Sequence, residues 1–129
     1  MVNDPLADAL NTIKTNEIAG KQECIIFPAS RLIRAVLLIF QRQGYIGEFE
    51  FVDDGTSGSF KIRLVGKVNS CGAIKPRFAV KTTEWNKWEQ RYIPSRDFGL
   101  LIVSTPKGIM TNRDAKGKNT GGRLIAYVY

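Results

Sequence analysis

The sequence contains no histidine and only two cysteines, Cys24 and Cys71. Without imidazole, the chain cannot build a Ser-His or Cys-His catalytic pair. Two thiolates alone cannot complete the closed tetrahedral site that zinc prefers, so we expect no metal. Free cysteines are most often buried, and we therefore expect two reduced thiols inside the fold.

Several other sequence signatures are missing. The apolar runs are far too short to span a bilayer, and no basic amphipathic segment of the membrane-surface type is present, so we expect no membrane partner. A Walker sequence and a dinucleotide-binding fingerprint are both absent, and we expect neither a cofactor nor catalysis. Asp53 and Asp54 precede a glycine, which is typical of a turn rather than of a catalytic pair. The start of the chain lacks the basic region of a signal peptide, which favours the cytoplasm.

Positive charge is abundant and unevenly placed. The chain carries 19 Lys and Arg against 12 Asp and Glu, a net charge of +7. Residues 1–66 contain seven basic and eight acidic side chains, whereas residues 67–129 contain twelve basic and four acidic ones. The whole positive excess therefore lies in the second half, a distribution that favours a polyanionic partner such as nucleic acid.

The first half of the chain predicts the order α-β-α-β-β. Asn3 or Asp4 followed by Pro5 is typical of a helix start. Ser30 and Gly44 have the residue types expected at the two ends of a second helix. Alternating and β-branched runs predict the strands. We expect helices over residues 5–16 and 30–43, and strands over residues 24–27, 45–52 and 60–64.

The second half predicts a mainly β subdomain with short helical turns. We place the boundary in a glycine-bracketed segment where the charge balance changes, which gives an N-terminal α/β subdomain, 1–68, and a C-terminal one, 69–129, of an α+β protein. Pro76 predicts an edge or a bulge in a strand over residues 74–81. Thr111 and Asp114 resemble a capping box. Further strands are expected over residues 100–103 and 124–129.

Two tryptophans, Trp85 and Trp88, lie three positions apart in a short helix or turn expected over residues 83–90. This spacing places both indole rings on one side. The rings either pack on the core or stack on nucleic-acid bases, and the sequence leaves both interpretations open.

The segment after the strand at residues 100–103 carries the residues best suited to RNA. Ser104 and Thr105 place hydroxyl groups where they can meet a base edge or a 2′-hydroxyl, although a simple turn is the commoner role of such a pair. Gly108, Gly121 and Gly122 allow a ligand to approach the backbone closely. The basic side chains available to phosphates are Lys107, Arg113, Lys116, Lys118 and Arg123.

Residues 103–111, the Asp114-Ala115 pair and residues 121–129 closely resemble the C-terminal signature of the small-subunit ribosomal protein S8 family. Residues 4–8, 28–30, 44–46 and 74–77 are similar to the archaeal and eukaryotic branch, so the resemblance covers the whole chain. It implies a structural protein of the small ribosomal subunit, without enzymatic activity, that lies beside neighbouring ribosomal proteins. It also implies direct binding to the central domain of small-subunit ribosomal RNA, which the protein helps to assemble. Members of the family can bind their own messenger RNA as well.

The same resemblance assigns an RNA contact to Ser104 and Thr105, because the family has a Ser-Thr-Ser segment there. Pro106 replaces the third residue and removes a hydroxyl and an N–H donor. Arg123, after the double glycine, matches the archaeal type. The expected RNA-binding residues are thus Ser104, Thr105, Lys107, Gly108, Arg113, Lys116, Lys118, Gly121, Gly122 and Arg123. Secondary candidates are Arg31, Arg34, Lys75 and Arg77, and a solvated helix surface explains the first two equally well.

Two other classes of function stay open at this point. A non-specific nucleic-acid packaging or DNA-binding protein would share the basic half but would lose RNA easily to bulk duplex DNA. A phosphate-handling enzyme would need a turnover that survives stringent purification.

Overall fold

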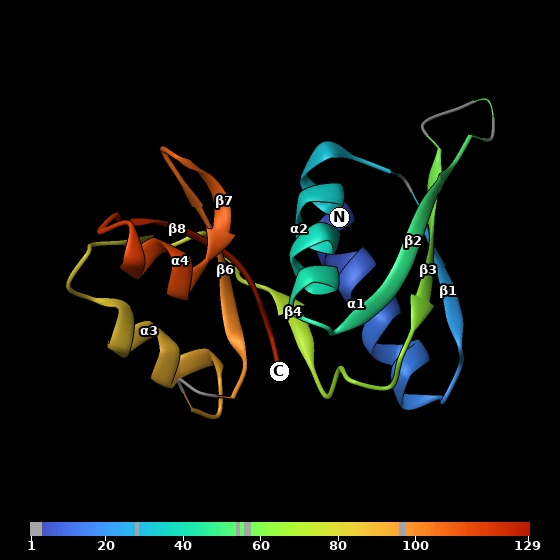
Figure 1. Ribbon diagram of the computed structural model, residues 1–129, viewed down its shortest axis with the longest axis horizontal. Coiled ribbons are helices and arrows are strands. Elements are labelled where there is room, and N and C mark those ends of the chain that lie inside the picture. Colours follow the sequence, from blue (N-terminus) through green and yellow to red (C-terminus); the bar gives the residue numbers. More distant parts are fainter. Residues whose placement is uncertain (1–3, 28, 54, 56–57, 96–97) are drawn as a thin grey trace. The chain divides into compact units, whose positions relative to one another are not determined.

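The chain folds as an α+β protein. The structure, a computed structural model, describes residues 4–27, 29–53, 55, 58–95 and 98–129. Contacts divide the chain into two compact units, Met1–Cys71 and Gly72–Tyr129. Helices and strands occur in both units (Figure 1). Within the described residues, no helix is long and apolar enough to cross a membrane.

The first unit has the predicted order α-β-α-β-β. The middle strand of its sheet pairs antiparallel with the two others, and both helices pack on one face (Figure 1). Phe40, Leu10 and Ile62 are among the fully buried side chains that fill this core. The elements are α1 (Pro5–Ile18), β1 (Glu23–Ile26), α2 (Arg31–Arg42), β2 (Ile46–Val52) and β3 (Ser59–Leu64), with sheet order β1-β3-β2.

The helices of this unit start at side-chain oxygens that satisfy backbone N–H groups of the first turn. Asp4 accepts two such hydrogen bonds in α1, at 3.0 and 3.2 Å, and Ser30 accepts one in α2, at 3.1 Å. The predicted caps at Asp4 and Ser30 are thereby confirmed, whereas Asn3 lies outside the described residues. α1 ends later than expected, at Ile18, shortly before Gly20 turns the chain with a φ of +74°.

Cys24 and Cys71 are buried free thiols, as the sequence predicts. Burial raises the pKa of Cys24 to about 11 and that of Cys71 to about 12, above the ordinary value of 9.0. Because the thiolate is the reactive form, both side chains are inert at neutral pH. The unfolded chain releases these thiol protons at lower pH than the folded chain does. Raising the pH above 9 therefore favours the unfolded state, and the free energy of unfolding falls.

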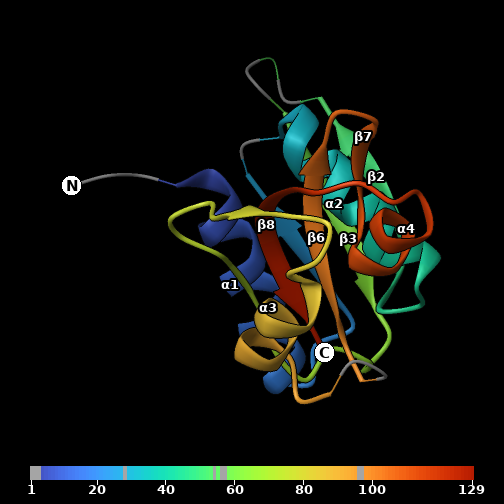
Figure 2. The same ribbon diagram turned by 90° about the vertical axis from the view of Figure 1, so that its left-hand side faces the viewer.

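The rest of the chain forms a second sheet and two short helices. The sheet has the order β4-β8-β6-β7, and β5 also pairs with β8. α3 and α4 lie on the same face of this sheet (Figures 1 and 2). The elements are β4 (Cys71–Ala73), β5 (Ala79–Val80), α3 (Trp85–Tyr92), β6 (Leu100–Thr105), β7 (Gly108–Thr111), α4 (Asn112–Gly117) and β8 (Gly122–Val128).

Two strand predictions in this part of the chain are wrong. A continuous strand over residues 74–81 does not form, because Pro76 lacks the N–H that a ladder needs, and only β4 and β5 flank it. The peptide bond before Pro76 is cis. The strand expected over residues 100–103 was placed too short, since β6 continues to Thr105 and an unexpected strand, β7, pairs with it as a hairpin. The sequence therefore understated how much of the hydroxyl-rich segment belongs to the sheet.

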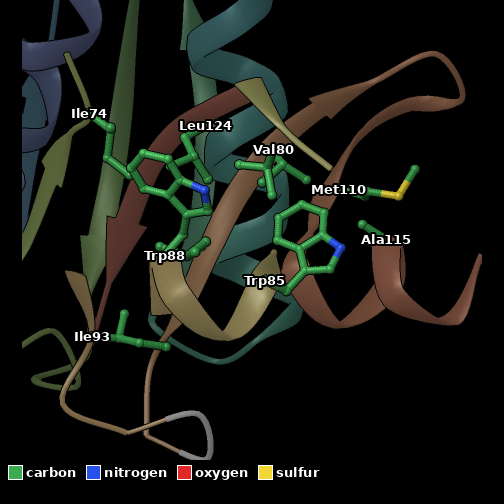
Figure 3. Packing of buried hydrophobic residues seen from close by; sticks show 10 residues of the cluster. Ile74, Val80, Trp85, Trp88, Ile93, Met110, Ala115 and Leu124 are labelled. Carbon is green, nitrogen blue, oxygen red and sulfur yellow. The ribbon is translucent and has the colours of Figure 1, made fainter. Parts of the chain in front are cut away.

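Trp85 and Trp88 belong to the core of the second unit. They are 3% and 7% exposed and pack in a cluster with Val80 and Leu124 under α3 (Figure 3). Such burial leaves no ring face for a nucleic-acid base. Of the two interpretations that the sequence allows, core packing is the one that agrees with the structure.

Candidate nucleic-acid interface

Four strands of the second unit place side chains in one row across the sheet. Ser104 of β6 lies directly opposite both Arg123 of β8 and Ile109 of β7, and Arg123 in turn lies opposite Ala79 of β5. Direct partners in an antiparallel sheet point to the same face. Val103, one position before Ser104, faces the core beneath the helices, so the row lies on the opposite face. The fold thus brings the predicted residues Ser104 and Arg123 together.

The side chains of Thr105 and Ser104 lie on opposite faces of the sheet. Its hydroxyl donates to the carbonyl of Gly108 at 2.8 Å and accepts from the N–H of Lys107 at 3.1 Å. The same oxygen lies 3.9 Å from the sulfur of Met110, a member of the core cluster. Thr105 therefore has the turn-forming role that the sequence left open, and its oxygen keeps one acceptor position for a ligand.

Pro106 occupies the two-residue turn between β6 and β7. Thr105 and Gly108 form the last pair of the hairpin, and the φ of +119° at Gly108 favours glycine. The fixed φ of proline suits the first position of a turn, and the ladder makes no use of an N–H there. The proline that departs from the family segment is accommodated by the hairpin, although it presents no hydroxyl.

The hairpin turn and the end of α4 meet through Lys107. Its ammonium group donates to the carbonyl of Lys118 at 3.3 Å, a favourable place for a cation near a helix C-terminus. Across the sheet, the guanidinium of Arg123 donates to the carbonyl of Arg77 at 3.4 Å, which brings this secondary candidate to the row. We call this region the sheet-end surface and define it as Arg77, Ser104, Thr105, Lys107, Gly108, Ile109, Lys118 and Arg123.

Lys116 forms an ion pair with a buried carboxylate. Its ammonium contacts both carboxylate oxygens of Glu89 at 2.7 Å, and Glu89 is only 3% exposed. Glu89 was not among the predicted residues, although the sequence carries a signal for it. Glu89 shares one helical stripe with Trp85 and Trp88, and an acidic residue on a core-facing stripe requires a cationic or hydrogen-bonding partner.

Gly121 and Gly122 are required by the protein's own backbone. A Cβ on Gly121 would lie 2.4 Å from the carbonyl oxygen of Val80, and a Cβ on Gly122 would lie 2.4 Å from that of Ser104. The close approach that the sequence suggested for a ligand is therefore used by neighbouring strands. Gly108 is different, because a Cβ there would meet nothing within 4 Å.

The remaining predicted residues are distributed over three places. Arg113 is exposed on α4, and Lys75 is exposed between β4 and β5. Arg31 and Arg34 belong to α2 in the first unit, where they line a hollow together with Phe51 and other residues. These two arginines are therefore in a different unit from the sheet-end surface.

The family model described as ribosomal protein S8 matches residues 4–129 of this chain. The match spans both compact units and includes every residue of the sheet-end surface.

Proposed function

The chain belongs to the ribosomal protein S8 family, so it is a small-subunit ribosomal protein that binds ribosomal RNA, and we propose that it binds this RNA through the sheet-end surface. The family is structural rather than enzymatic. We further propose that the target is the central domain of small-subunit ribosomal RNA, that binding supports assembly of this domain, and that the chain belongs to the archaeal and eukaryotic branch.

The cross-strand row is the observation that carries this proposal. It combines the hydroxyl of Ser104, the guanidinium of Arg123 and the apolar side chain of Ile109 on neighbouring strands. A hydroxyl can donate to or accept from a base edge or a 2′-hydroxyl, while a guanidinium can meet phosphate or stack on a base. Rigid strands hold these groups in fixed positions, as recognition of an irregular RNA shape requires.

The other predicted residues divide into contacts with the RNA backbone and supports for the surface. Lys107, Lys118 and Arg113 are exposed cations suited to phosphates, and Gly108 offers an open stretch of backbone. Gly121 and Gly122 act by allowing β8 to approach its neighbours. The residue order Gly122-Arg123 supports the assignment to the archaeal and eukaryotic branch.

Specific recognition predicts that the protein prefers a central-domain RNA helix with unpaired bases to a scrambled duplex of equal length. We expect a preference of about 10³-fold or more at physiological salt, measured by fluorescence anisotropy. Thr105→Ala should reduce the preference because it removes the hydroxyl that organises the turn, whereas Thr105→Ser should retain it. Equal affinity of the unmodified protein for both RNAs would refute the specific interaction, and easy displacement by bulk duplex DNA would favour a packaging protein. The chain's own messenger RNA, which we propose as a second ligand of the surface, is tested in the same assay.

Removal of the Arg123 charge should change the salt dependence of RNA binding. If the guanidinium meets one phosphate, Arg123→Ala reduces the magnitude of the negative slope of log K against log salt by about one. Lys67→Ala removes an exposed charge of the first unit and serves as the matched control, with an unchanged slope. Identical slopes for Arg123→Ala and the unmodified protein would exclude this phosphate contact.

A further inference from the structure

A buried carboxylate joins the two helices of the second unit. Glu89 of α3 is 3% exposed, and both of its oxygens accept from the ammonium group of Lys116 on α4. One of these oxygens also accepts from the side-chain amide of Asn112, the first residue of α4. Glutamate is almost never this deeply buried unless it is paired, so the three side chains form one interdependent cluster.

Asn112 extends this cluster to the sheet. Its side chain is fully buried, and its carbonyl oxygen accepts from the backbone N–H of Leu101 in β6 at 3.2 Å. The last pair between β6 and β7 is Ile102 with Thr111. Asn112 therefore binds β6 at the next residue, Leu101, just after β7 has ended. The side chains of Glu89, Lys116 and Asn112 therefore tie α3, α4 and β6 together.

The position of α4 bears directly on the sheet-end surface. A helix of six residues is too short to be stable without packing. α4 carries the exposed Arg113 and leads to Lys118, whose carbonyl receives the ammonium of Lys107. The placement of these three cations therefore depends on how α4 is fixed.

From these contacts we propose that Glu89 is a positioning residue for RNA binding, and that Lys116 neutralises Glu89 instead of contacting a phosphate. This inference rests on the proposed function, because it assumes that the sheet-end surface binds RNA. Moving the ammonium of Lys116 to a phosphate would leave a carboxylate buried without its counter-ion, which is strongly unfavourable. Lys116 therefore strengthens RNA binding through the arrangement of α4.

The salt dependence of RNA binding distinguishes a positioning role from a phosphate contact. We compare Lys116→Met with Lys118→Met, using a central-domain RNA helix at several salt concentrations. Lys118→Met should lower the magnitude of the slope by about one, whereas Lys116→Met should weaken binding about tenfold with the slope unchanged. A reduction of about one in the magnitude of the slope for Lys116→Met would overturn the inference.

A double variant tests the role of the buried charge. Lys116→Met alone leaves Glu89 without its cation, whereas Glu89→Gln/Lys116→Met leaves no buried charge and keeps an oxygen that can accept from Asn112. The double variant should therefore bind the RNA helix more tightly than Lys116→Met, by about threefold or more. Binding equal to or weaker than that of Lys116→Met would contradict the positioning role.

Trp85 supplies a readout that does not involve RNA. Its indole ring packs in the cluster that contains Ala115 of α4, while Trp88 packs in the same cluster toward Ile74 (Figure 3). In a ¹H–¹⁵N spectrum of the full chain, Lys116→Met should shift the indole resonance of Trp85 more than that of Trp88, and the double variant should reverse part of the shift. An unmoved Trp85 resonance would show that the cluster does not position α4. A failure of the proposed function is recognised separately, because the unmodified protein would then fail to prefer the RNA helix.

Discussion

Gly122→Ala should lower the free energy of unfolding by about 2 to 3 kcal/mol, because the added methyl group collides with the backbone. The new Cβ would lie 2.4 Å from the carbonyl oxygen of Ser104 and 3.0 Å from the methyl group of Thr105. A backbone carbonyl cannot rotate away as the end of a flexible side chain can. β8 must therefore move away from β6 at the position where Arg123 lies beside Ser104. We expect weaker RNA binding together with the loss of stability.

Gly117→Ala is the matched control for this substitution. Gly117 is the last residue of α4, and a Cβ there would meet nothing within 4 Å. Because alanine is the better helix former, this variant should be as stable as the unmodified protein or slightly more stable. Urea denaturation of the two variants measures the difference. Equal stabilities would mean that the close approach of β8 to β6 is not a constraint on the fold.

Trp88→Ala should destabilise the protein by about 3 to 5 kcal/mol, since it removes a large buried ring from a packed core. The ring of Trp88 stacks on Phe78 with centroids 4.8 Å apart, and it is only 7% exposed. Its indole N–H has no hydrogen-bond partner among the described residues. Trp88→Phe removes that unsatisfied donor and keeps an aromatic ring, so it should cost less than about 1.5 kcal/mol.

This pair of variants distinguishes core packing from base stacking. If Trp88 packs on the core, the folded fraction of Trp88→Ala binds the RNA helix with nearly unchanged affinity, while the midpoint of urea unfolding falls. If the ring instead stacked on a base, stability would change little and affinity would fall by about 1 to 3 kcal/mol. Affinity measured well below the unfolding midpoint separates the two cases.

The first unit was predictable because each of its elements carries its own local signals. Asp4 and Ser30 cap helices with short-range hydrogen bonds, and the strands have alternating or β-branched residues. β7 was missed because it carries no such local signal. It is a strand of four residues whose Pro106-Lys107 turn lacks the Asn-Gly type of hairpin signal, and its conformation depends on pairing with β6.

The candidate site could be predicted in its residue types but not in its arrangement. Hydroxyl, glycine and basic residues after residue 103 suggested an RNA surface, and the family resemblance named Ser104 and Thr105. The register places Arg123 opposite Ser104, and strand alternation sends Thr105 to the other face. Sequence alone assigned Lys116 to a phosphate and did not show that its ammonium group pairs with Glu89, which lies 27 positions away in the chain.

Chemical-shift mapping can show whether ribosomal RNA binds at the sheet-end surface. The ¹⁵N-labelled full chain is titrated with a central-domain RNA helix, and the shift of every assigned backbone amide is followed. We expect the largest changes at residues 104–109, 113–118 and 121–123 and around Arg77, with little change along α1. Large changes confined to the first unit, or equal changes with a scrambled duplex, would contradict specific RNA binding at the sheet-end surface.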